Sequence, residues 1–226
     1  MEKRIHLQLS NVIGVIHTEG GFAEAEKQGL DGVEVRVDAL PDPPSTAQVA
    51  ALSVPAILTV RRLDEGGVKP IGDGERLAYY LALLPAAAAV DIEIRSARRL
   101  RDVIEATRRE GKLLIVSFHD FEATPSLAKL RGILARARGL GADIVKIATK
   151  TETPSAVARL LMLLEEASDP LAVMGIGALG GASRLLFAKA GSVLNYGWLD
   201  KPQVQGQWSA KEFVELLARV TPAITL

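Results

Sequence analysis

The stretch KLLIVSFHDFEATPSLAKLRGILARARGLGADIVKI, residues 112–147, contains one complete strand–helix–strand unit. Two short apolar runs with β character, Lys112–Ser117 and Ala142–Ile147, stand on either side of a segment at 126–139 that is rich in Leu, Ala and Arg. That composition favours a helix. Because strands joined by a helix run parallel with a right-handed crossover, the stretch predicts a parallel α/β fold.

Units of this kind recur along the chain. The predicted strands are Ile5–Leu9, Gly32–Val37, Ala56–Arg61, Ala89–Ile94, Lys112–Ser117, Ala142–Ile147, Leu171–Met174 and Ser192–Tyr196. Helical patterns follow them at 21–29, 45–52, 74–84, 97–110, 126–139, 154–167, 181–190 and 209–219. A closed barrel and an open doubly wound sheet both fit this alternation. No Gly-x-Gly-x-x-Gly follows the first strand, and the eight units favour a single (β/α)8 TIM barrel over residues 1–226.

Two threonine–proline pairs mark predicted helix starts. Thr124-Pro125 and Thr153-Pro154 each offer a side-chain oxygen for the helix N-cap and a proline for the first turn. We therefore expect one helix to begin at each pair.

The composition excludes several classes of protein. Lys plus Arg and Asp plus Glu are equal at 27 each, which argues against a nucleic-acid binder with a basic face. The chain has no cysteine, so disulfides, cysteine-ligated zinc and a thiol nucleophile are excluded. The N-terminus carries no signal-peptide pattern, and the apolar run Leu81–Val90 is too short for a membrane span and contains Pro85. We expect a cytoplasmic protein that does not bind membranes.

Charged residues gather where strands are predicted to end. In a β/α barrel the active site lies at the C-terminal ends of the strands. Buried strands are normally apolar, so each charge there needs a partner or a function. The candidates are Glu34, Arg36 and Asp38 after the second strand, Arg61 and Glu65 after the third, Asp91 and Glu93 in the fourth, His119 after the fifth and Lys146 in the sixth.

Lys146 stands within the apolar sequence Ile144-Val145-Lys146-Ile147-Ala148. Burial disfavours the ammonium form, and a neutral amine can attack a carbonyl to form a Schiff base. A structural ion pair with Asp91 or Glu93 inside the barrel is the alternative, and the spacing alone leaves both open.

His119 is one of three histidines and ends the strand next to the one that carries Lys146. An imidazole can take and return a proton near neutral pH. It has no metal-ligand spacing with His6 or His17, so we expect no metal site.

Arginines and a glycine-rich loop allow two readings each. Arg36, Arg61 and Arg184 can bind a carboxylate or hydroxyls, or can pair with the nearby acidic residues. The loop Gly175–Gly181 precedes a helix and fits either a phosphate cradle or a tight turn. The run Arg95–Arg101 is interpreted as a solvated helix face.

Taken in order, these motifs resemble those of the type I 3-dehydroquinate dehydratases over nearly the whole chain. The matching stretches are Glu34–Asp38, Thr59–Arg61 with Glu65-Gly66-Gly67, Asp91–Glu93, Ser117–Pro125, Gly141–Ala148, Ser183-Arg184 and Gly206-Gln207.

The resemblance implies a role for each matching position. Lys146 would be the Schiff-base lysine, His119 the general acid and base, and Glu65 the glutamate that partners the histidine. Glu34, Arg36, Arg61, Arg184, Gln203, Gln207 and, through a looser match at the end of the first strand, Ser10 would bind substrate. Met174 and Tyr196 fall at positions of the pocket wall, where the family usually has phenylalanine in place of Tyr196. The family implies 3-dehydroquinate as substrate, no cofactor, the shikimate pathway of aromatic amino acid biosynthesis, and a homodimer.

One loop departs from the family pattern. The closing loop commonly reads Ser-Ala-Pro-Gly-Gln, whereas this chain has Gln203-Val204-Gln205-Gly206-Gln207. Such loops exclude water and complete a site. Two alternatives to the dehydratase therefore remain at this point: another Schiff-base barrel enzyme such as an aldolase, and a catalytically impaired barrel that acts as a binding module.

Overall fold

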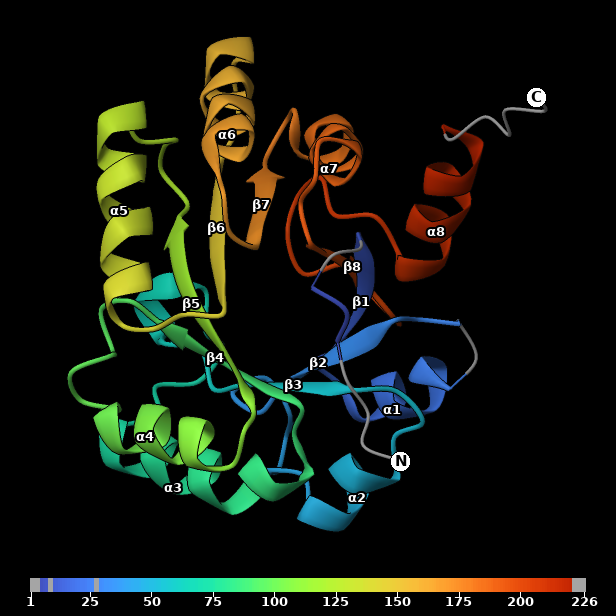
Figure 1. Cartoon of the computed structure of the whole chain (residues 1–226). Helices are drawn as coiled ribbons and strands as arrows, with labels where there is room; N and C mark the ends of the chain where they lie inside the picture. Colours follow the sequence, from blue (N-terminus) through green and yellow to red (C-terminus); the bar gives the residue numbers. More distant parts are fainter. Residues whose placement is uncertain (1–4, 8–9, 27–28, 221–226) are drawn as a thin grey trace.

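The computed structural model of the chain is a barrel of eight parallel strands with helices around it (Figure 1), described for residues 5–7, 10–26 and 29–220. The strands are β1 (Asn11–Ile16), β2 (Gly32–Arg36), β3 (Ala56–Thr59), β4 (Ala89–Glu93), β5 (Leu113–Asp120), β6 (Ile144–Lys150), β7 (Leu171–Ile176) and β8 (Leu194–Trp198). They pair in the order β7-β6-β5-β4-β3-β2-β1-β8. The predicted fold class is confirmed.

The helices alternate with the strands. They are α1 (Glu19–Ala25), α2 (Thr46–Ala51), α3 (Asp73–Leu83), α4 (Arg101–Arg109), α5 (Leu127–Gly139), α6 (Pro154–Glu166), α7 (Gly180–Lys189) and α8 (Ala210–Arg219), with short 3-10 helices η1 (Leu63–Glu65) and η2 (Leu84–Ala86). The predicted continuation of the first helix to residues 27–28 lies outside the described residues.

The first strand is the main error of the sequence prediction. The described part of the run 5–9 contains no strand, and β1 begins at Asn11 instead. Gly14 in the middle of β1 weakens the strand pattern in the sequence. Other elements pack closely against this glycine, because a Cβ there would lie 2.5 Å from Leu30 Cδ1 and 2.8 Å from Leu199 Cδ2, and both leucine side chains would have to shift. Packing against the surrounding elements therefore selects a segment that local propensity disfavours.

One of the two predicted helix starts is correct. The Thr153 side chain accepts a hydrogen bond from Ala156 N, and Pro154 occupies the first turn of α6. Thr124-Pro125 does not start α5, because Ser126 is the N-cap and accepts from Lys129 N. The Thr124 hydroxyl instead donates to Lys150 O at 2.6 Å, so it joins the end of β6 to the loop after β5.

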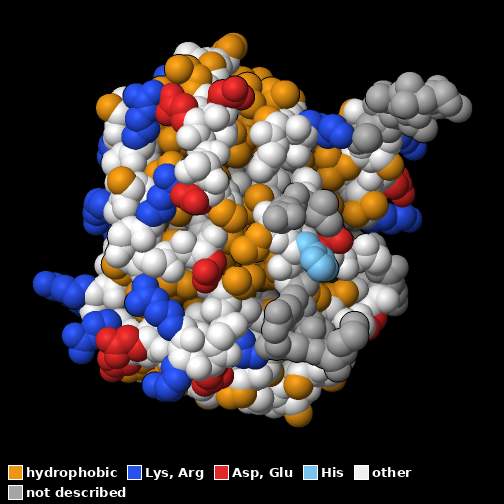
Figure 2. All heavy atoms as spheres, viewed as in Figure 1, with side chains coloured by type: hydrophobic (Ala, Val, Ile, Leu, Met, Phe, Trp, Pro, Cys, Tyr) orange, Lys and Arg blue, Asp and Glu red, His pale blue; other side chains and the backbone are white. Residues whose placement is uncertain are grey.

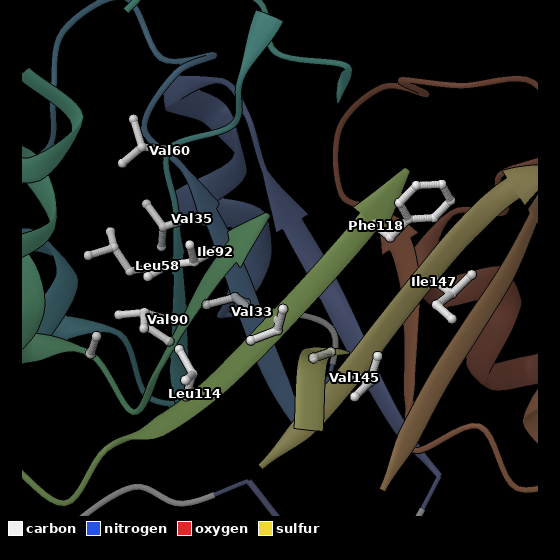
Figure 3. Close-up of a cluster of buried hydrophobic side chains, with 14 of the residues drawn as sticks. Val33, Val35, Leu58, Val60, Val90, Ile92, Leu114, Phe118, Val145 and Ile147 are labelled. Carbon is white, nitrogen blue, oxygen red and sulfur yellow. The ribbon is translucent and has the colours of Figure 1, made fainter. Parts of the chain in front are cut away.

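Side chains alternate along each strand between two apolar regions. Those that point outward pack under the helices, and Figure 3 shows Val145 and Ile147 of β6 among them. Those that point inward fill the barrel interior, where Ile144 and Ala148 of β6 lie. Because Lys146 has the parity of Ile144 and Ala148, the alternation turns its side chain into the barrel.

The barrel is nearly closed, with β7 and β8 at its two edges. Side chains take over part of the hydrogen bonding at this seam. Arg184 Nε donates to Gly175 O of β7 at 3.0 Å, and its Nη1 donates to Tyr196 O of β8 at 3.1 Å. The Ser192 hydroxyl accepts from Val173 N at 3.0 Å. The seam therefore holds a buried guanidinium that donates to a carbonyl of each edge strand.

The outer surface matches the balanced composition. Basic and acidic side chains are interspersed over the helices on the face seen in Figure 2. Arg99 pairs with Asp73 at 2.7 Å, and the exposed Arg101 lies 3.4 Å from Glu105. The arginines of the run Arg95–Arg101 are exposed, but residues 94–100 form turns and α4 begins only at Arg101, so the predicted helix face is wrong and the run is a solvated turn. In the described part of the chain no helix is long and apolar enough to span a membrane.

Candidate active site

A cavity of about 530 Å³ opens at the C-terminal ends of the strands. Nine of the ten predicted site residues line it: Glu34, Arg36, Arg61, Glu65, His119, Lys146, Arg184, Gln203 and Gln207. Met174 and Tyr196 line it as well. Residues far apart in the sequence therefore meet in one cavity, which the barrel topology alone explains.

Ser10 is the predicted site residue that the structure does not bring to the cavity. It precedes β1 and so lies at the N-terminal end of the strand, whereas the cavity lies at the C-terminal ends. Its hydroxyl accepts a hydrogen bond from Asn195 Nδ2 at 2.8 Å. The expectation that Ser10 ends the first strand is wrong, because that strand was placed too early in the sequence.

Lys146 is buried, with 3 % of its surface exposed. Its Nζ donates to Glu34 Oε1 at 3.0 Å and to Asp91 Oδ2 at 2.9 Å, and it lies 3.9 Å from the centre of the Tyr196 ring. The expectation of apolar surroundings is wrong, because alternation along β6 turns the lysine away from its apolar sequence neighbours. Two carboxylates and an aromatic face are contacts that favour a cation.

Arg61 organises the carboxylates around the lysine. Its guanidinium contacts both oxygens of Asp91, at 3.1 and 2.8 Å, and Glu93 Oε1 at 3.2 Å. Burial opposes the charge of Arg61, but Asp91 and Glu93 outweigh it and raise its pKa well above the usual value. Burial likewise opposes ionisation of Asp91, and Arg61 and Lys146 reverse this and lower its pKa. Asp91 is thus held as an anion between two cations.

Glu93 pairs with arginines and is not a partner of Lys146. Besides Arg61, it accepts from Arg76 Nη2 at 2.5 Å. Of the two ion pairs that the sequence left open for Lys146, the structure contains the one with Asp91. This pair is compatible with a chemical role, because the same amine also borders the cavity.

Arg36 forms a forked pair with Asp38. Its Nε and Nη2 donate to the two carboxylate oxygens at 2.9 and 2.7 Å, and Nη2 also donates to Gly66 O at 3.0 Å. Burial would raise the pKa of Asp38, but the hydrogen bonds and charge of Arg36 lower it below the usual value. The pair ties the end of β2 to the loop after β3 and places the guanidinium at the cavity.

His119 and Glu65 form a second buried pair. Glu65 Oε2 lies 3.2 Å from both Nδ1 and the backbone N of His119. Burial, followed by the charges of Arg61 and Lys146, lowers the pKa of His119 well below its usual value. Burial and the charge of Glu93 raise the pKa of Glu65 to about 7. The imidazole is therefore neutral at neutral pH and free to accept a proton.

Arg184 is a buried cation that borders the cavity and contacts backbone carbonyls at the β7–β8 seam. Burial lowers the pKa of its guanidinium to about 10. No carboxylate of the described residues lies within ion-pair distance of it, unlike Arg36 and Arg61. A buried guanidinium of this kind can bind an anion that enters the cavity.

The glycine-rich loop Gly175–Gly181 packs against the backbone of the closing loop, residues 203–207. Gly177 N donates to Gln205 O at 3.1 Å, and Trp208 Nε1 donates to Gly181 O at 2.9 Å. Gly206 has a φ of +80°, and a Cβ there would lie 2.8 Å from Gly177 O and 2.9 Å from Gly181 N. The backbone of the closing loop thus covers the start of α7. This arrangement disfavours a phosphate cradle at Gly175–Gly181 and fits the alternative, a tight turn.

Within the closing loop, a hydrogen bond joins Gln203 and Gln207. Gln207 Oε1 accepts from Gln203 N at 3.2 Å, and Trp198 Nε1 donates to Gln207 O at 3.2 Å. Both glutamines reach the cavity, so the departure from the family pattern leaves the loop over the site.

The sequence reasoning missed His17 and Lys201, which also line the cavity. His17 follows β1 directly, and burial lowers its pKa. Correct placement of β1 would have put this histidine at a strand's C-terminal end and so found it. Lys201 follows β8 in a loop with no charge pattern that singles it out.

An eightfold β/α barrel with buried charged side chains around a cavity at the C-terminal ends of its strands has the arrangement of a barrel enzyme. A family model described as "Type I 3-dehydroquinase" matches residues 18–221. A 3-dehydroquinate dehydratase of Pyrococcus abyssi is 35% identical over 211 residues, covering 92% of this chain and 96% of the relative. One of Methanocella arvoryzae is 32% identical over 207 residues, covering 90% and 94%.

Solved structures agree with these relatives. The crystal structure of the 3-dehydroquinate dehydratase of Aquifex aeolicus is 30% identical, with a TM-score of 0.82, and the match covers 93% of this chain and 99% of that one. That of Geobacillus kaustophilus has a TM-score of 0.84 at 24% identity, over 95% and 92% of the two chains. The chain belongs to the type I 3-dehydroquinase family.

Proposed function

We propose that this chain dehydrates 3-dehydroquinate to 3-dehydroshikimate through a Schiff base on Lys146. The observation that carries the proposal is the position of a buried lysine in one cavity with a neutral histidine and an arginine that has no acidic partner among the described residues. The first supplies a nucleophile, the second a base, and the third an anchor for a carboxylate. The family of the chain supports the same reaction.

The amine of Lys146 would attack the C3 ketone of the substrate. The ammonium ion and the ketone together give an iminium ion and one water molecule, so charge and atoms balance. Asp91 and Glu34, both within hydrogen-bond distance of Nζ, can relay the protons that the nitrogen loses. The iminium then withdraws electrons from C2, which a neutral ketone does poorly.

His119 would move the proton between C2 and the departing hydroxyl. Its low pKa leaves the imidazole neutral and able to take the C2 proton. When Nδ1 carries a hydrogen and donates it to Glu65, Nε2 is the free acceptor. The protonated imidazole then donates to the leaving C1 hydroxyl, and hydrolysis of the imine releases the product. Acid–base catalysis of this kind contributes typically ~10²–10⁴-fold.

Arg184 would bind the substrate carboxylate, while Glu34, Arg36, Arg61, Gln203 and Gln207 would contact hydroxyls and close the site. The carboxylate restores a charge partner to Arg184. It also fixes the ring so that C3 faces Lys146.

The test is an absorbance assay for dehydroshikimate together with reduction by borohydride in the presence of substrate. We expect activity and a covalent adduct in the native chain, and neither in Lys146→Ala. Lys150→Ala is the matched control, because Lys150 lies on the same strand and outside the lining of the cavity. An active Lys146→Ala, or a native chain that dehydrates substrate without ever forming an adduct, would contradict the mechanism.

We further propose that the chain is one catalytic domain that works as a homodimer in the cytoplasm, within the shikimate pathway, as the family implies. Light scattering coupled to gel filtration tests the dimer. A mass near that of one 24.1 kDa chain at micromolar concentration would contradict it.

A further inference from the structure

The mechanism above leaves the aromatic face over Lys146 without a role. Tyr196 comes from β8 and points into the barrel, where its ring centre lies 3.9 Å from Lys146 Nζ. Its hydroxyl is buried and has no hydrogen-bond partner among the described residues. The contact with the amine is therefore made by the ring, and the hydroxyl contributes nothing visible to it.

Schiff-base formation changes what the nitrogen can bond to. An ammonium group has three N–H donors, and Lys146 directs them toward Glu34 and Asp91. A protonated imine on the same nitrogen has one N–H and is planar. At most one of the two carboxylate hydrogen bonds therefore survives the reaction.

The two carboxylates keep other hydrogen-bond donors when the imine forms, whereas the nitrogen has no other acceptor among the described residues to turn to. Asp91 already accepts from Arg61 and from the Ser117 hydroxyl, and Glu34 Oε1 accepts from the Thr59 hydroxyl at 2.9 Å. The carboxylates remain satisfied, and the imine nitrogen is the group that loses partners. An aromatic face attracts a cation through its quadrupole and needs no N–H for this.

We propose that the ring of Tyr196 stabilises the positive charge of the Schiff base on Lys146, and so keeps the imine protonated after most of its hydrogen bonds are lost. The inference rests on the proposed function and adds to it a group that touches the reacting nitrogen. Protonation is what makes the imine an electron sink, so the ring supports the step in which His119 removes the C2 proton.

Charged groups from the other strands also surround the imine nitrogen. They are Glu34 of β2, Arg61 from the end of β3, Asp91 of β4 and His119 of β5. All of them stay unchanged when the ring alone is altered. A series of substitutions at position 196 therefore isolates the contribution of the ring.

The experiment replaces Tyr196 with phenylalanine, with phenylalanines of increasing fluorine content, and with leucine. Fluorination keeps the shape and weakens the quadrupole. Tyr196→Phe is the reference of the series, because it keeps the ring and removes only a hydroxyl that has no partner among the described residues. Along the fluorinated series the alkaline limb of kcat should move to lower pH step by step, by about one pH unit in total. Tyr196→Leu should show the full shift.

Two further readouts separate this role from a structural one. The fraction of enzyme that borohydride traps at pH 9 with saturating substrate should fall in the same order, by about tenfold in Tyr196→Leu. Across the fluorinated variants, whose rings keep the same shape, the affinity for quinate, which has a hydroxyl in place of the ketone and cannot form an imine, should not follow fluorine content. The fluorinated variants keep the test valid even if Tyr196→Leu does not fold.

A flat series, in which kcat and its pH dependence do not follow fluorine content, would overturn the inference while leaving the dehydratase intact. A fluorinated series in which quinate binding changes in parallel would also overturn it, because the ring would then act on ligand binding and not through the imine. If the native chain gives no adduct at all, the proposed function fails first, and this inference fails with it.

Discussion

Single side chains in this site owe their properties to burial beside a few chosen partners. Asp91 is the clearest case, because it is fully buried and contacts Arg61, Lys146 and the Ser117 hydroxyl. Removal of one partner from such a group leaves an uncompensated charge, which typically costs about 3–5 kcal/mol. The charges are therefore coupled, and a substitution at one of them alters the others.

Glu65 gives a pH-dependent prediction. Its pKa is raised to about 7 in the folded chain from a usual value of 4.5. Between these values the folded state binds more protons than the unfolded state, so this carboxyl lowers stability as pH rises. In Glu65→Gln that penalty is absent. Relative to the native chain, its free energy of unfolding should rise between pH 5 and pH 8 by on the order of 2–3 kcal/mol.

Urea unfolding at both pH values measures the effect, and Glu122→Gln serves as an exposed control. A difference between Glu65→Gln and the native chain that stays constant with pH would show that the carboxyl is ionised normally in the fold.

Arg184 both bonds the β7–β8 seam and borders the cavity, so we expect its substitution to have two effects. Arg184→Met should lower the free energy of unfolding by about 1–3 kcal/mol, because the carbonyls of Gly175 and Tyr196 lose their donor. It should also abolish the rise in melting temperature that quinate gives to the native chain. Arg159→Met is the control, since Arg159 also donates to a backbone carbonyl but lies outside the lining of the cavity.

Melting curves with and without quinate test both effects. A variant that keeps the full response to quinate would mean that the carboxylate is held elsewhere.

At the scale of elements, the closing loop depends on a contact between glycines. The backbone at Gly206 approaches the start of α7 so closely that no side chain fits. The substitutions at Gln203 and Gln205 relative to the family pattern leave this contact in place, since the backbone makes it. The seating of the loop therefore survives a change in the loop's side chains.

Gly206→Ala should displace the loop and lower kcat/KM by about tenfold or more, since misplaced closure exposes the site to water. Gly191→Ala is the matched control. Gly191 also has a positive φ, of +107°, but nothing lies within 4 Å of its added Cβ. Both variants carry the backbone strain, of about 1 kcal/mol, and only Gly206→Ala carries the clash. Steady-state kinetics on both variants is the measurement. An equal loss of activity in Gly206→Ala and Gly191→Ala would contradict the prediction.

At the scale of the whole molecule, the strands of the barrel form one continuous sheet that ends at β7 and β8. If the chain is one domain, as proposed, unfolding is cooperative across it. Circular dichroism follows all the helices, whereas Trp198 and Trp208 report only on β8 and the closing loop. We expect the two urea transitions to coincide. An earlier fluorescence transition would mean that the β8 end opens independently.

The repetition of strands and helices predicted the barrel because it is a local property of the sequence. Apolar runs and helical composition are read within ten or so residues, and eight repeats of them leave few topologies. Motifs at the strand ends predicted six of the lining residues for the same reason, whereas Arg184 lies in a helix and Gln203 and Gln207 came from the resemblance to the family. The first strand was placed wrongly, because Gly14 weakens its strand pattern. The residues that pack against Gly14, Leu30 and Leu199, lie outside the local stretch of sequence.

The sequence by itself determined the parallel barrel, the family pattern and the set of charged groups at the strand ends. The tertiary structure decided how those groups meet: Lys146 between two carboxylates and a ring, Arg184 in the seam, and Ser10 at the opposite end of the barrel. The physical reason is that the energy of a buried charge depends on partners within a few ångströms. In this barrel those partners come from different strands, and only closure of the sheet brings them together.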